Sequence, residues 1–172
     1  MFGGNVRPVG LSNDTVMGKG GTAWRKMTKT PKEGAEDAEL AGLRLLTQLD
    51  DKYAKNGTLK DLVMDAAADD IEWWAAGPPD ILPWADSFRG KAAFENWFAV
   101  LEKALNYEKR ERYETVAQGN TVVGFIHAGG HARTTGRLCQ SDIVRVWSFR
   151  GGKLARVRSF YDTAAYVTAY RS

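Results

Sequence analysis

The sequence has little of several residue types that identify common classes of protein. Cys139 is the only cysteine among 172 residues, so no internal disulfide can form. The two histidines have no cysteine or carboxylate cluster beside them, and we expect neither a metal nor a cofactor. No apolar run approaches the roughly 18 residues that cross a membrane, and the first residues lack the apolar core of a secretory signal. We therefore expect a protein that is neither transmembrane nor secreted, located in the cytoplasm or in an organelle lumen or stroma.

Positive charge is concentrated at the start of the chain. Residues 1–32 hold six basic residues and a single acid, Asp14, in a chain whose net charge is +3. The remainder is close to neutral, which argues against a nucleic-acid-binding fold. Residues 1–35 are rich in Gly, Thr and Lys and show no apolar period, which predicts a flexible basic arm. This arm is either a solvated tail or a docking segment, with candidate partner contacts at Phe2, Trp24, Arg25, Lys26 and Met27.

Residues 36–172 have the pattern of one α+β domain. Apolar residues recur at helical spacing from residue 36 to Gly57, again up to about residue 66, and most clearly over 94–105. Asp162 is the residue type that caps a final helix. The region from Gly129 and Gly130 to Gly136 indicates a turn. Strand patterns occupy residues 71–75, 107–117, 121–128, 138–149 and 153–161. This order predicts a cone-shaped, curved antiparallel sheet wrapped around helices.

Three stretches resemble the SnoaL-like, polyketide-cyclase-type members of the nuclear transport factor 2-like superfamily. They read LDDKYAKNGTLKDLVMDAAADDIEWWAAGPP, FRGKAAFENWFAVLEKAL and SDIVRVWSFRGGKLARVRSFYDTAAY. The resemblance covers residues 40 to 170 and implies a ligand cavity between the helices and the concave face of the sheet. The superfamily includes isomerases, cyclases, dehydratases, epoxide hydrolases, carotenoid binders and non-catalytic subunits, so the fold does not identify a reaction.

The resemblance also assigns positions to known catalytic patterns. Ketosteroid isomerases have their general base at the position of Ala75, their oxyanion-hole Asp at Arg145 and their oxyanion-hole Tyr near Asp50. Because enolising proton transfer needs a carboxylate base and neutral donors, steroid-type isomerisation is disfavoured. Ser159 stands where epoxide hydrolases of this fold have the second Asp of an Asp-Arg-Asp network. Arg145 and Asp50 remain the candidates for a catalytic role.

Arg145 is the strongest individual candidate for a functional residue. Strand alternation and the superfamily count place it on the concave face. A guanidinium among aromatic side chains is costly unless it engages a ligand carboxylate, enolate or carbonyl, or forms an ion pair with Asp50 or Glu72. Val144 and Val146 fall on the opposite face and predict a homodimer.

The aromatic residues predict a cage for a flat apolar ligand. Trp73 and Trp74 are adjacent in a strand and must point to opposite faces, and the prediction places Trp74 in the cone. The same residues could instead form an ordinary core. A solvated edge is expected for Lys109, Arg110, Glu111 and Arg112, and a surface position for His127 and His131. The predicted ligand contacts are Tyr53, Trp74, Phe98, Ile143, Arg145 and Trp147.

Two classes of function follow. The first is a small-molecule protein, either a cyclase, isomerase or dehydratase type of enzyme or a carrier of an apolar compound. The second is a non-catalytic accessory or assembly subunit of a larger complex that docks through its basic arm. The sequence leaves open whether the chain is an enzyme.

Overall fold

The computed structural model describes residues 40, 42–48 and 60–171, all within the unit formed by residues 31–172. Residues 42–48 are helical, and the buried Leu45 and Leu46 face the core. The predictions for the basic arm and for the helix end at Gly57 lie outside the described residues. The boundary between arm and domain therefore stays a prediction.

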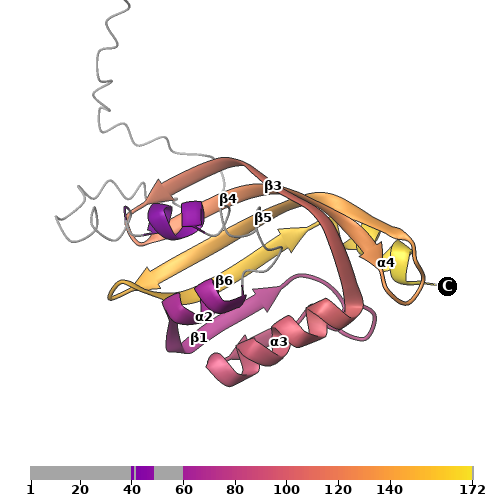
Figure 1. Ribbon diagram of the computed structural model, residues 1–172, viewed down its shortest axis with the longest axis horizontal. Coiled ribbons are helices and arrows are strands. Elements are labelled where there is room, and N and C mark those ends of the chain that lie inside the picture. The colour runs from indigo at the N-terminus through magenta and orange to yellow at the C-terminus, as the bar shows by residue number, and fades with distance from the viewer. Residues whose placement is uncertain (1–39, 41, 49–59, 172) are drawn as a thin grey trace, which may run out of the picture. The chain divides into compact units, whose positions relative to one another are not determined.

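In the described chain, helices precede and follow runs of consecutive strands, which is the order expected of an α+β domain (Figure 1). All four predicted strands after residue 105 form, within a few residues of the expected ends. The elements are α2 (Lys60–Ala66), β1 (Ala67–Ala75), β2 (Ser87–Arg89), α3 (Lys91–Ala104), β3 (Leu105–Gln118), β4 (Thr121–Ala132), β5 (Leu138–Arg150), β6 (Lys153–Tyr161) and α4 (Thr163–Tyr170).

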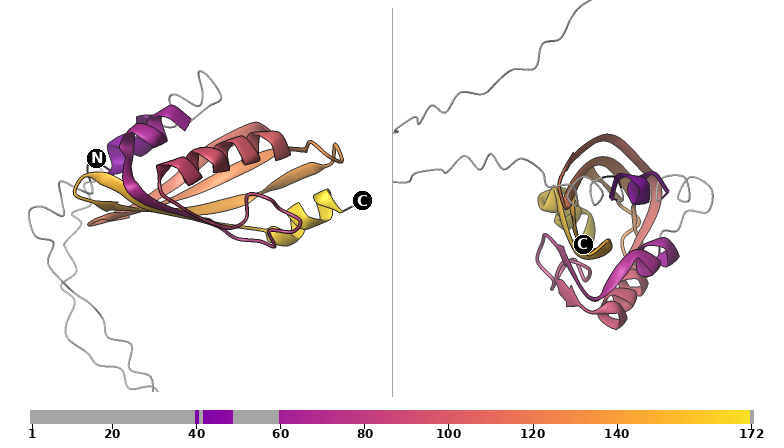
Figure 2. Two further views of the ribbon diagram at one scale, coloured as in Figure 1. Left: turned by 90° about the horizontal axis from the view of Figure 1, so that it is seen from below. Right: turned by 90° about the vertical axis from the view of Figure 1, so that its left-hand side faces the viewer.

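The strands form one curved sheet in the order β2-β1-β6-β5-β4-β3, and α3 lies across its concave side (Figure 2). Every neighbouring pair is antiparallel except β1 with β6, which run parallel. The predicted curved sheet is confirmed, with this one parallel pair as an addition. The short edge strand β2 was not predicted, because three residues carry too little alternation to be recognised.

The predicted turn region from Gly129 to Gly136 is confirmed only in its second half, because β4 continues through Gly129 and Gly130 to Ala132. Close backbone packing explains why residue 130 is a glycine. A Cβ atom on Gly130 would overlap the carbonyl oxygen of Asn106 on β3, where the register of the two strands shifts. The chain turns instead after Ala132, where Gly136 has a φ of +68°.

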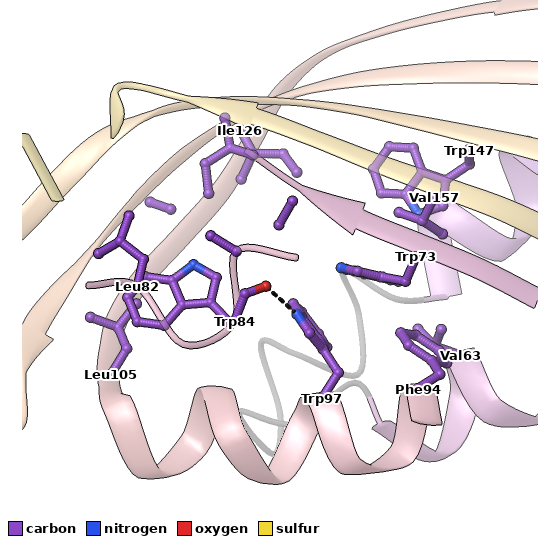
Figure 3. Packing of buried hydrophobic residues seen from close by; sticks show 14 of the residues in the cluster. Val63, Trp73, Leu82, Trp84, Phe94, Trp97, Leu105, Ile126, Trp147 and Val157 are labelled. Carbon is purple, nitrogen blue, oxygen red and sulfur yellow. Dashed lines mark hydrogen bonds between the residues drawn. The ribbon is translucent and has the colours of Figure 1, made fainter. Parts of the chain in front are cut away.

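Aromatic side chains fill the space between α3 and the concave face. The ring of Trp73 stacks on that of Phe94 with 4.6 Å between centroids and lies 4.2 Å from that of Trp97. The indole nitrogen of Trp97 donates to the carbonyl oxygen of Trp84 over 3.0 Å, which ties α3 to the loop between β1 and β2 (Figure 3). These contacts fix the inner side of β1 against the helix.

The final helix begins where the sequence predicts. The carboxylate of Asp162 accepts hydrogen bonds from the backbone nitrogens of Ala164 at 3.0 Å and Ala165 at 3.1 Å. α4 thereby brings Tyr166 and Tyr170 against Trp84 at one end of the core. None of the helices within the described ranges is both long and apolar enough to span a membrane.

Candidate functional site

Arg145 lies on the concave face of β5 among aromatic side chains. Its Nε donates to the hydroxyl of Ser159 on β6 over 3.0 Å. The guanidinium carbon is 5.2 Å from the ring centroid of Trp73 and 6.0 Å from that of Trp147. Strand alternation therefore placed Ile143, Arg145 and Trp147 on the correct face, since Ile143 and Trp147 are both buried in the core.

A small space borders the guanidinium. Its volume is about 10 Å³, which suits one group the size of a water molecule. The expected open aromatic cavity is thus absent from this part of the described interior. The lining residues come from four strands, two helices and the loop after β1, and they are Ala75, Trp84, Trp97, Leu101, Tyr107, Ile143, Arg145, Ser159, Tyr161 and Tyr166.

The groups around this space are hydrogen-bond donors. Burial, together with the nearby charge of Arg110, lowers the pKa of Arg145 to about 10, so the guanidinium stays charged at neutral pH. Burial raises the pKa of Tyr161 and of Tyr166, so both phenols stay protonated. The Tyr161 hydroxyl accepts from the indole nitrogen of Trp84 over 2.9 Å and keeps its own proton to donate.

The hydroxyl of Tyr166 is buried and makes no hydrogen bond of normal geometry with any described residue, although Tyr107 and Ser141 are close enough to influence its pKa. An unsatisfied buried hydroxyl is costly. No Asp, Glu or His belongs to the described lining. The site therefore suits an oxygen atom that accepts hydrogen bonds, and it offers no general base from the residues that the structure describes.

The predicted ion pair between Arg145 and Glu72 is wrong. Glu72 lies on the other face of β1, where it contacts Arg156 at 3.0 Å and Arg89 at 3.8 Å. Within the described residues, no carboxylate lies at ion-pair distance from Arg145. The other predicted partner, Asp50, and the predicted ligand contact Tyr53 lie outside the described residues.

The prediction chose the wrong tryptophan of the adjacent pair. Trp73 points into the core, whereas Trp74 points outward and contacts the ring of Phe160 at 5.2 Å. The resemblance could have identified the correct tryptophan. It places Ala75 at the position of an inward-facing catalytic base, and strand alternation gives Trp73 the same face as Ala75. Phe98 is half-buried and packs on Phe94 with 5.0 Å between ring centroids, without bordering the space beside Arg145.

Arg110 and Arg112 are also placed differently from the prediction. They pair in register with the buried Ala128 and Ile126, so they share the concave face with Arg145 and are not a solvated edge. A Cβ on Gly124 would lie 3.1 Å from Cδ of Arg112, which shows how far this side chain reaches inward. Two bulges in β3 shift its alternation, and the sequence gives no sign of them.

Several lining residues were missed altogether. Alternation from Ser159 identifies Tyr161 as inward, and the Asp162 cap places Tyr166 one helical turn inside α4. Trp84 lies in the proline-containing loop after β1 and has no periodic signal. Neither histidine borders the space beside Arg145. His127 contacts Asp142 on the outer face, and His131 contacts Glu108 at 2.8 Å.

The curved sheet over helices and its donor-lined interior define an α+β protein of the nuclear transport factor 2-like superfamily. The model of the SnoaL-like domain family matches residues 53–157, and the chain belongs to this family. No curated protein matches the sequence.

Solved structures agree on the fold. A nuclear transport factor 2-like protein from Burkholderia xenovorans is 25% identical, with a TM-score of 0.66 over 77% of this chain and 98% of its own. A candidate SnoaL-like polyketide cyclase from Jannaschia is 15% identical, with a TM-score of 0.62 over 83% and 96%. TerC, co-crystallised with polyporic acid, is 20% identical, with a TM-score of 0.61 over 81% and 100%.

Proposed function

We propose that the SnoaL-like domain binds a small, flat ligand through an oxygen that contacts Arg145. The observation that carries this proposal is a charged guanidinium in an aromatic interior with no described carboxylate at ion-pair distance. A charge in such a place is costly unless a partner compensates it. A ligand carboxylate, enolate or polarised carbonyl supplies that partner. The co-crystallisation of the similarly folded TerC with an acid supports this choice of ligand.

The donor set suits the stabilisation of an oxyanion. Arg145 offers a positive charge, and Tyr161 and Tyr166 offer phenolic protons that burial keeps in place. A reaction of the cyclase, isomerase or dehydratase type also needs a base to move a proton. The sequence identifies no unambiguous base, although Asp50 is one of its two candidates for a catalytic role. A carrier needs no base, so the donor set is compatible with ligand transport as well as with the electrostatic half of catalysis.

The small size of the space sets a condition on binding. About 10 Å³ holds an oxygen but not the body of a ligand. Trp97 and Leu101 of α3 border the space, so a flat ligand enters only if this helix face moves away from β5. We therefore expect binding to be accompanied by a shift of α3.

A ligand screen on two arginine variants tests the proposal. Thermal unfolding is measured with hydrophobic ketones, epoxides and aromatic acids for the wild type, for Arg145→Met and for Arg150→Met. Arg150 is the matched control, because it lies on the same strand but is exposed and pairs with Asp70. A ligand that binds the folded state raises the midpoint. The expected result is a rise in the wild type and in Arg150→Met that Arg145→Met loses; an equal rise in all three contradicts the assignment.

The second candidate is a non-catalytic accessory subunit that docks through residues 1–35. The absence of a base from the described lining and the small interior space favour it. The test compares the full chain with residues 36–172. Docking through the arm predicts that partner capture is lost on truncation and weakens with salt, because exposed charges are screened. Ligand-induced stabilisation unaffected by the truncation, with no partner captured by either form, supports the first candidate.

A further inference from the structure

A second recess lies on the outer face of the sheet, over the neighbouring strands β2, β1 and β6. It is an open groove of about 470 Å³, within the usual range for small-ligand sites. Its outward-facing side chains belong to none of the residues around Arg145. They are Glu72, Trp74, Ser87, Arg89, Arg156 and Arg158.

Strand register creates this surface. In the parallel pair, Trp74 stands beside Arg158 and Glu72 beside Arg156. On the other side of β1, Ser87 of β2 is opposite Trp74. Neighbouring residues on paired strands share a face, so the side chains form two adjacent rows across the three strands. One row is Ser87, Trp74 and Arg158, and the other is Arg89, Glu72 and Arg156.

The guanidinium of Arg158 is held on aromatic rings. Its carbon lies 4.8 Å from the ring centroid of Trp74 and 5.3 Å from that of Phe160. Phe160 is 39% exposed, so part of its ring is open to solvent beside the arginine. Cation–π contacts restrict the arginine and reduce the entropy lost when it binds an anion.

Charge in the groove is unbalanced. Three arginines face one carboxylate, and that carboxylate, Glu72, is already shared by Arg89 and Arg156. Arg158 forms no ion pair with any acid in the described ranges. The groove thus combines an unshared guanidinium with exposed aromatic surface beside it.

We propose that this groove binds a planar aromatic carboxylate. A guanidinium matches a carboxylate with two parallel hydrogen bonds, and the rings of Trp74 and Phe160 supply apolar contact for the aromatic body. The site is separate from the Arg145 site, because the two arginines lie on opposite faces of the sheet. Val146, which pairs with Arg158, also belongs to the face predicted to dimerise, so a second copy of the chain is the competing occupant.

The test uses the full-length protein labelled with ¹⁵N and follows the indole signals of its six tryptophans. The probe is 2-naphthoate, and the matched neutral control is 2-naphthamide. Trp74→Phe identifies the Trp74 signal. The expected result is that naphthoate shifts this signal in a saturable way, while the amide binds at least about tenfold more weakly because it lacks the charge.

Two variants decide which arginine is responsible. Arg158→Gln is expected to weaken the naphthoate-dependent shift of the Trp74 signal about tenfold, and Arg150→Gln, whose exposed side chain pairs with Asp70 outside the groove, is expected to leave it unchanged. The indole signals of the four buried tryptophans, Trp73, Trp84, Trp97 and Trp147, report whether each variant is folded. Arg156→Gln provides a second variant in the groove with a smaller expected effect. Equal binding of the amide, an unchanged affinity in Arg158→Gln, or a Trp74 signal that shifts only with protein concentration overturns the proposal. The last outcome assigns the groove to a second copy.

Discussion

Arg145 and Ser159 are direct partners in the register of β5 and β6, and the arginine Nε donates to the serine hydroxyl over 3.0 Å. Ser159 is only 2% exposed, so the contact is made inside the domain. The serine fixes one edge of the guanidinium but carries no charge to balance it. Replacing this arginine should therefore change the stability of the domain less than replacing one member of a buried ion pair would.

Arg145→Leu tests this difference. Removing a half-buried charge that has no acidic partner among the described residues leaves none of their carboxylates unpaired, so we expect the free energy of unfolding to change by less than about 1 kcal/mol. Urea denaturation measures it. A loss of about 3–5 kcal/mol would reveal a buried partner, with Asp50 as the candidate. In that case Asp50→Ala should cost as much, and the double variant should recover stability.

The adjacent tryptophans provide a matched pair of variants. Trp73→Ala removes a ring stacked on Phe94 and Trp97 in the core, and we expect it to cost about 3–5 kcal/mol. Trp74→Ala removes a half-buried ring on the outer face and should cost less than about 2 kcal/mol. Chemical denaturation of both variants gives the comparison. Equal costs would mean that both rings are buried in solution, as a tight dimer over the outer face would require.

The two consecutive glycines of β4 should differ sharply in their tolerance of alanine. A Cβ on Gly130 would overlap the backbone of Asn106, whereas the nearest atom to a Cβ on Gly129 is 3.6 Å away, on Gln140. We expect Gly130→Ala to lower stability by about 3 kcal/mol or more and Gly129→Ala by less than about 1 kcal/mol. Thermal and urea unfolding measure both. A mild effect of Gly130→Ala would show that β3 can move away from β4 at its bulge.

Dimerisation through the outer face is open to a direct test. Val144 and Val146 are half-buried there, and Val144 pairs with the exposed Phe160. We expect light scattering to report a dimer at about 50 µM and Val144→Asp, whose cross-strand neighbours are Phe125 and Phe160, to shift it to monomer, because a buried unpaired charge is costly. Thr168→Asp on the exposed side of α4 adds the same charge elsewhere and should leave the dimer intact. A wild-type monomer at that concentration would refute the prediction.

Local patterns in the sequence were enough for most of the fold. The apolar spacing around Phe94 and Trp97 identified α3, and the Asp162 cap located the start of α4. Alternation also placed Arg145 correctly, because β5 is regular around it. These features depend on neighbouring residues, which is the range over which sequence periodicity carries information.

The site was harder to predict because it depends on contacts between distant segments. Trp84 reaches the interior from a loop that is held by Trp97, and Arg110 turns inward because of bulges in β3. Neither event has a local signature. The volume beside Arg145 is also a result of packing among several elements, so a list of inward residues could not reveal that only about 10 Å³ remains.

The parallel pairing of β1 with β6 has a consequence for how the chain folds as it is synthesised. β1 is complete at Ala75, but its central neighbour ends only at Tyr161. Until that strand leaves the ribosome, Trp73 lacks its β6 neighbour Val157, and one edge of β1 has no partner within the described sheet. Such non-local closure slows folding and exposes an apolar strand in the meantime. The last strand is therefore the step that commits the nascent domain to its native state.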